Sequence, residues 1–114
     1  MIREPVAVQV GGYPDDDACL AVGRVAPVHG SKLKLEVRDR PDDKGRIVAS
    51  IPADSYVWMC DVSANGEWTG ILFSHRPDGR ISCGVSGTIP EREDYDGPCR
   101  QGWVPQDTII LYAG

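Results

Sequence analysis

The sequence predicts an all-β domain, and three observations support this prediction. Short segments in which every second residue is apolar run from Leu35 to Trp68, and each ends at Pro, Gly, Asn or Asp. Such alternation is typical of short strands joined by tight turns. The 13 Gly and 9 Pro among 114 residues favour turns over helices. No apolar run approaches the roughly 20 residues of a membrane-spanning helix, so we expect no membrane insertion.

Two segments near the start of the chain are expected to form strands. In Pro5–Val10 the three valines share one face, as in a half-buried strand, and Gly11 and Gly12 end it. Cys19–Val25 is a second apolar segment. The three acids Asp15–Asp17 between them lack the alternating spacing, the glycine and the distal glutamate of a calcium loop. We interpret them as a solvated acidic loop.

The central region predicts strands whose two faces can be assigned. Leu35 and Val37 should point inward, and the following turn is expected at Pro41–Gly45, where Pro fixes φ and Gly tolerates positive φ. Ile47–Ile51 is the next strand. Asp54 should then take the left-handed conformation in a tight turn, since Asp tolerates that region better than most residues.

The next strand presents two kinds of side chain to its two faces. Val57 and Met59 are expected inward, whereas Trp58 and Cys60 lie on the other face. Asn65-Gly66 is a strong hairpin signal that leads into a strand over residues 68–73.

The order of these pieces resembles the bacterial SH3-like (SH3b) domain. The pieces that carry the resemblance are Leu35-Glu36-Val37-Arg38-Asp39-Arg40-Pro41, Ile47-Val48-Ala49-Ser50-Ile51, Tyr56-Val57-Trp58, Gly66-Glu67-Trp68 and Gly102-Trp103-Val104. The resemblance implies a small SH3-like barrel of about five strands within one domain, residues 1–114. Its core would span residues 33–73 and 102–112, residues 74–101 would be an insertion, and residues 1–30 would add one or two strands at its edge.

The insertion departs from the usual short connection of this family. Most of it is polar, and a loop of this length is usually functional or tethered. We predict that it binds a partner through four acidic residues, Glu91, Glu93, Asp94 and Asp96.

Four cysteines, none in a C-x-x-C pair, favour two disulfides over a zinc site, with three connectivities possible. We expect Cys83–Cys99, because these residues flank one insertion whose ends must return to neighbouring strands, and by elimination Cys19–Cys60. Disulfides imply an oxidising compartment. Since Met1–Pro5 is no secretory signal, we expect a periplasmic or secreted protein whose signal peptide is absent from this sequence. A cytoplasmic protein with reduced thiols is the alternative.

Composition and motifs exclude several classes of function. A net charge of −5 disfavours nucleic acid and anionic membranes as partners. The two histidines, His29 and His75, have no accompanying catalytic motif, and pairing of Cys60 and Cys83 in disulfides would remove a cysteine nucleophile. We therefore expect no enzyme, no cofactor and no metal site.

Aromatic residues suggest a ligand surface. Trp68 and Trp103 match the two tryptophan positions of the family, which implies that they line a groove, although completion of a small core is equally compatible. The predicted ligand-binding residues are Trp58, Trp68, Tyr95 and Trp103. The first functional hypothesis is a module that binds a cell-envelope peptide or peptidoglycan. The second is a free-standing inhibitor or immunity-type protein that binds a basic protein through its acidic inserted loop.

Overall fold

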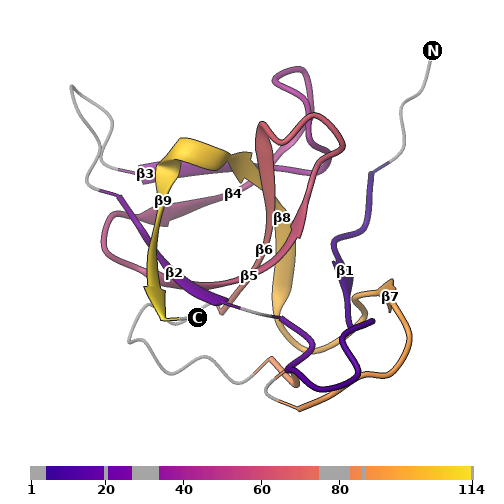
Figure 1. Cartoon of the computed structure of the whole chain (residues 1–114). Helices are drawn as coiled ribbons and strands as arrows, with labels where there is room; N and C mark the ends of the chain where they lie inside the picture. The colour runs from indigo at the N-terminus through magenta and orange to yellow at the C-terminus, as the bar shows by residue number, and fades with distance from the viewer. Residues whose placement is uncertain (1–4, 20, 27–33, 75–82, 86, 114) are drawn as a thin grey trace.

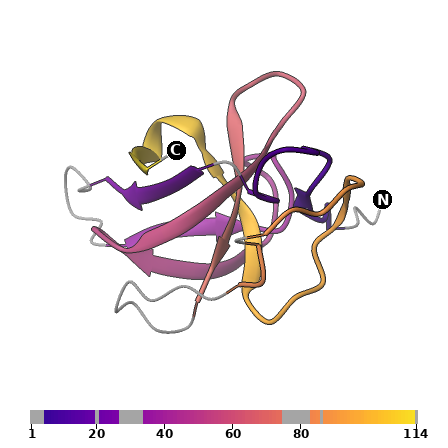
Figure 2. The ribbon, with the colours of Figure 1, turned by 60° about the horizontal axis from the view of Figure 1, so that its bottom comes forward.

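The computed structural model describes residues 5–19, 21–26, 34–74, 83–85 and 87–113 (Figure 1). Within these residues the chain forms a seven-stranded sheet in the order β4-β3-β8-β6-β5-β2-β9 and a separate two-stranded sheet, β1-β7. The larger sheet curls into a barrel-like wall that is not closed, so β4 and β9 are its edges (Figures 1 and 2). The predicted all-β, barrel-like fold is confirmed.

All strand pairs of the larger sheet are antiparallel, as expected for strands joined by hairpins. Its strands are β2 (Ala21–Val25), β3 (Lys34–Arg38), β4 (Ile47–Pro52), β5 (Tyr56–Val62), β6 (Trp68–Phe73), β8 (Arg100–Pro105) and β9 (Ile109–Ala113). A short 3-10 helix, Gln106–Thr108, joins the last two. The return of Gly102–Val104 to the barrel is confirmed, because β8 lies between β6 and β3.

The N-terminal strands differ from the sequence prediction in their positions. β2 was expected at the sheet edge but lies between β5 and β9. Gly23 permits this, since a Cβ at that position would lie 2.2 Å from a methyl carbon of Ile109. β1 (Gln9–Val10) pairs with β7 (Glu93–Asp94) of the insertion and not with the barrel. The two N-terminal strands therefore differ in position: β2 belongs to the seven-stranded sheet, whereas β1 pairs with the insertion.

The structure has two hydrophobic cores, one on each side of β5, β6 and β8. The barrel core lies inside the curved sheet and comprises Val25, Leu35, Val37, Ile51, Val57, Ile71, Phe73, Val104 and Ile109. The outer core lies on the opposite face and comprises Val8, Val10, Ala18, Cys19, Cys60, Leu72, Cys83, Val85, Tyr95 and Trp103. The predicted alternation along β5 is confirmed: Val57 and Met59 contribute to the barrel core, and Trp58 and Cys60 to the outer core.

Turn chemistry follows the sequence closely. Asp54 has φ of 68°, which makes it the one non-glycine residue with positive φ in the described part of the chain. Gly66, in the predicted hairpin, has φ of 76°. The turn at Pro41–Gly45 is closed by a hydrogen bond from the Gly45 amide to the Asp42 carbonyl oxygen. The sequence also suggests a turn at residues 27–30 and a short strand at 81–83; the turn, and residues 81 and 82 of the strand, lie outside the described residues.

Close packing in the barrel core generates the first prediction. A Cβ at Gly102 would lie 2.3 Å from Cγ1 of Val37 and 2.9 Å from the Arg38 carbonyl oxygen. We expect Gly102→Ala to lower the free energy of unfolding by about 1–3 kcal/mol in chemical denaturation, because β8 must move away from β3. The matched control is Gly87→Ala, whose Cβ would meet nothing within 4 Å. Equal stability of the two variants would contradict the packing described here.

Candidate functional site

The N-terminal segment and the insertion pack together against the outer face of β5, β6 and β8. We call residues 5–19 and 83–99 the lobe. Its two halves are joined by β1-β7 pairing and by backbone hydrogen bonds from Gly12 to Ile89 and from Ala18 to Gly87, both 2.9 Å. The insertion is therefore more than a polar loop, since Val85 and Tyr95 are buried in the outer core.

Two disulfides fix the lobe to the barrel and close it, which confirms both predicted pairs. Cys19–Cys60 ties the N-terminal half to β5, with a Cα–Cα distance of 4.4 Å, and Cys83–Cys99 joins the ends of the insertion, at 5.2 Å. Cys19, Cys60 and Cys83 are buried in the outer core, and Cys99 packs against it. Two disulfides are compatible with an oxidising, extracellular or periplasmic location.

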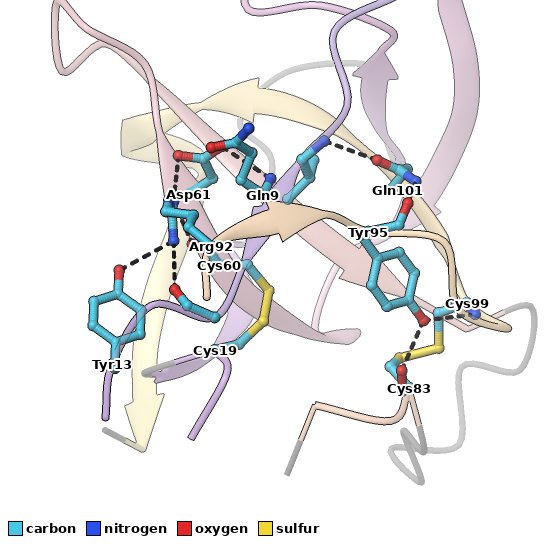
Figure 3. The surroundings of a disulfide bond; sticks show 12 residues. Gln9, Tyr13, Cys19, Cys60, Asp61, Cys83, Arg92, Tyr95, Cys99 and Gln101 are labelled. Carbon is cyan, nitrogen blue, oxygen red and sulfur yellow. Dashed lines mark hydrogen bonds and ion pairs between the residues drawn. A yellow bond between two sulfur atoms is a disulfide. The ribbon is translucent and has the colours of Figure 1, made fainter. Parts of the chain in front are cut away.

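Tyr95 fastens the closed end of the insertion. Its hydroxyl donates a hydrogen bond to the Cys83 carbonyl oxygen at 2.8 Å and accepts one from the Cys99 amide at 3.0 Å (Figure 3). Burial raises the pKa of this phenol above 10.0, the Cys99 hydrogen bond opposes that shift, and the charge of Asp96 adds to it. Gly97 allows the close approach, because a Cβ there would lie 2.5 Å from the hydroxyl oxygen.

Arg92 connects the insertion to both the N-terminal half and the barrel. Its guanidinium forms an ion pair with Asp61 at 2.9 Å and donates to the Gly11 carbonyl oxygen at 3.1 Å (Figure 3). The same group lies 5.8 Å from the centre of the Tyr13 ring, a cation–π distance. The one basic side chain of the lobe is thereby held by contacts with β5 and with the N-terminal half of the lobe.

The lobe carries the negative charge of the protein. It contains seven acidic residues and one base, a net charge of −6, while the rest of the chain has ten acidic and eleven basic side chains, a net charge of +1. All seven acids are exposed: Asp15, Asp16, Asp17, Glu91, Glu93, Asp94 and Asp96. Asp94 also accepts a hydrogen bond from the Gln9 side chain at 3.1 Å. The four acids predicted as partner-binding therefore belong to the same lobe as the Asp15–Asp17 loop, which is joined to the insertion by a hydrogen bond from the Thr88 hydroxyl to the Asp16 carbonyl oxygen at 3.0 Å.

The predicted aromatic residues separate into two groups. Trp103 is 2% exposed and Tyr95 6%, so both belong to the outer core and neither ring lines an open groove. Trp58 and Trp68 are half-buried and pack against the same core. All three tryptophans lie on the outer face of β5, β6 and β8, but the lobe covers much of that face. The ligand-contact role stays a prediction for Trp58 and Trp68.

The described residues contain neither a cluster of metal ligands nor a free cysteine. They include no group of three or more His, Cys, Asp or Glu side chains that could hold a metal ion. Cys60 and Cys83 are both in disulfides, so neither is a free thiol. His29 and His75 lie outside the described residues. No helix in the described ranges is long and apolar enough to cross a membrane.

The chain matches no protein-family model, no curated protein and no solved structure. The resemblance to SH3b domains therefore stays a prediction that rests on the sequence pieces given above.

Sequence reasoning missed the polar residues that hold the lobe in place. Gln101 donates to the Tyr95 carbonyl oxygen at 2.7 Å and accepts from the Val8 amide at 2.8 Å, and thus links β8 to the insertion and to the N-terminal segment. Nothing in the local sequence marks this glutamine. Arg92 had a signal, since it is the one base among the acids of the lobe.

Alkaline titration tests the position of Tyr95. Because its folded-state pKa is raised, its contribution to stability is complete below about pH 10 and falls as the pH rises through the folded-state value. Tyr95→Phe should remove this alkaline loss. At neutral pH it should cost about 1–3 kcal/mol through the unpaired Cys99 amide and Cys83 carbonyl groups. Tyrosinate absorbance and denaturation across pH measure both effects, with Tyr13→Phe as the control.

Reduction of the disulfides should destabilise the outer core more than the barrel core. The barrel core contains no cysteine, whereas the outer core contains or contacts all four. Disulfides closing 16 and 41 residues stabilise a fold by roughly 3 and 4 kcal/mol in the chain-entropy model. We expect reduced protein to lose hydrogen-exchange protection in the lobe before it loses that of β3, β4 and β9. Simultaneous loss in both regions would contradict this order, and alkylation with intact-mass measurement verifies the redox state.

Proposed function

We propose that this protein is a non-catalytic binding domain of an extracytoplasmic, oxidising compartment, and that its lobe binds a basic partner protein. The observation that carries the proposal is the segregation of charge: the lobe has a net charge of −6, whereas the rest of the chain has a net charge of +1. A field of one sign on one face steers an oppositely charged partner to that face and accelerates association.

Rigidity of the lobe supports this function. Two disulfides, the Arg92–Asp61 ion pair and the Tyr95 hydrogen bonds hold the lobe before any partner arrives. A preorganised surface loses less conformational entropy on binding than a free loop does. Arg92, the one base of the lobe, is paired with Asp61 of β5, so its charge is engaged within the protein. These features suit an inhibitor or immunity-type protein.

The second candidate is an SH3b-like module that binds a cell-envelope peptide or peptidoglycan, as the resemblance implies. The observation in its favour is that Trp58 and Trp68 are only half-buried on the outer face. Aromatic rings of this kind stack on extended peptides and on sugar or peptide faces. The burial of Trp103 and Tyr95 removes half of the aromatic surface that this function was expected to use.

Charge neutralisation distinguishes the two candidates. The lobe variant replaces Glu91, Glu93 and Asp96 by their amides, and the control replaces three exposed barrel acids, Asp43, Glu67 and Asp107, in the same way. We expect wild-type and control protein to capture one basic protein from an envelope extract. The lobe variant should bind the purified partner roughly tenfold more weakly, with a smaller salt dependence.

Equal binding by the lobe and control variants would contradict the charge-based proposal. Sedimentation with purified peptidoglycan is measured on the wild-type protein, the lobe variant and the control, and also on Trp58→Ala and Trp68→Ala. Sedimentation that Trp58→Ala or Trp68→Ala abolishes, together with no captured protein, would favour the second candidate.

A further inference from the structure

Residues 5–10 lie across the outer face of the barrel in the manner of a bound peptide. The segment forms hydrogen bonds with groups just after β3, on β8 and on β5, and it packs against Gly70 of β6 between them. The Val6 amide donates to the Asp39 carbonyl oxygen just after β3, at 2.9 Å. Trp103 of β8 donates its indole N–H to the Val6 carbonyl oxygen at 2.9 Å. Farther along, the Gln9 amide donates to the Asp61 carboxylate of β5 at 3.1 Å (Figure 3).

Side chains of the barrel, and not a neighbouring strand, supply most of these contacts. Gln101 accepts from the Val8 amide at 2.8 Å, and the Val8 carbonyl oxygen accepts from the Tyr95 amide at 2.9 Å. Regular strand pairing in this segment is confined to Gln9–Val10, which pair with β7. Contacts of this type recognise an extended backbone whatever its sequence, and leave selectivity to the pockets that receive alternate side chains.

Two alternate side chains of the segment are buried, as alternate side chains of a bound peptide would be. Val8 is 0% exposed and Val10 2% exposed, whereas Pro5, Val6 and Gln9 are exposed. Gly70 of β6 forms the floor beneath Val8: a Cβ there would lie 3.1 Å from one methyl group of Val8 and 2.9 Å from the Asp61 Cβ. A depression of this shape accepts a β-branched apolar side chain and excludes a charge.

We propose that the outer face of β5, β6 and β8 is a binding site for an extended, uncharged peptide with β-branched residues two positions apart, and that residues 5–10 occupy it intramolecularly. The recognition groups are Trp103, Gln101, Asp61 and the depression at Gly70. This inference does not rest on the proposed function of the acidic surface: the segment pairs with the backbone of Glu93 and Asp94, but the recognition groups named here are not lobe acids. The Val6 carbonyl oxygen of the segment supplies the hydrogen-bond partner that the buried indole N–H of Trp103 needs.

The attachment of the segment determines how an outside peptide would compete. Residues 11–18 and the Cys19–Cys60 disulfide hold the segment beside its site. Short tethers of this kind give effective concentrations on the order of millimolar, so a free peptide must overcome that local concentration. The site is therefore closed to weak ligands in the intact chain and opens when the segment is displaced.

The first experiment displaces the segment within the full chain. Val8→Asp places a charge in the buried pocket, and Pro5→Asp adds the same charge at an exposed position as the control. The probe is a fluorescent peptide of residues 5–12. We expect Val8→Asp protein to bind the probe at least about tenfold more tightly than wild-type or Pro5→Asp protein. A probe that itself carries Val8→Asp should bind none of the three.

A Val8→Asp chain that keeps the barrel spectrum by nuclear magnetic resonance but binds the probe no better than wild type overturns the proposal. If that variant does not fold, a second experiment decides. A protease site replaces the exposed residues 14–17, and the folded, oxidised protein is cleaved there. The N-terminal fragment should stay bound without a covalent link and exchange with excess probe. A fragment that leaves and does not rebind, or that excess probe never displaces, overturns the proposal.

Discussion

The structure depends on a strand that is buried on both faces. In β6, Ile71 and Phe73 point into the barrel core, and Leu72 points into the outer core. A sheet strand between two apolar layers gains burial from both sides, and its backbone is shielded from water on both. The N-terminal segment and the insertion are therefore not appendages. They provide the second layer, which buries the outer face of this strand.

The barrel was predictable because its signals are local. Period-two alternation, Asn65-Gly66 and Asp54 each specify structure within a few residues, and all three predictions are confirmed. The disulfide pairs were predictable from the position of the insertion. The lobe was less predictable because its contacts join distant positions. Gln101 bonds to Val8 across 93 residues, and no local pattern encodes such a pair.

Aromatic residues show the same limit at the candidate site. The sequence identifies Trp103 as a barrel residue but gives no indication of what covers its outer face. The Val6 carbonyl oxygen accepts a hydrogen bond from Trp103, and Val8 lies in the same core. The alternation predicted that Val6 and Val8 share a face, but Val6 is 46% exposed and Val8 0%. The acidic surface was partly predicted, since four of its members lie close together in the sequence. The Asp15–Asp17 loop joins them only through the folding of the lobe.

The separation of cysteines from the barrel core has a consequence for how the molecule matures. Four cysteines permit three pairings, and an unstructured chain has little basis for choosing among them. If the barrel forms first, it places Cys60 on its outer face. It also places Cys99 directly before β8, the strand that pairs with β6. Each thiol then finds its partner in a small volume. In such a chain the native disulfides form in preference to the other pairings. Chains whose sheet has not assembled form other pairings, which thiol exchange can still rearrange.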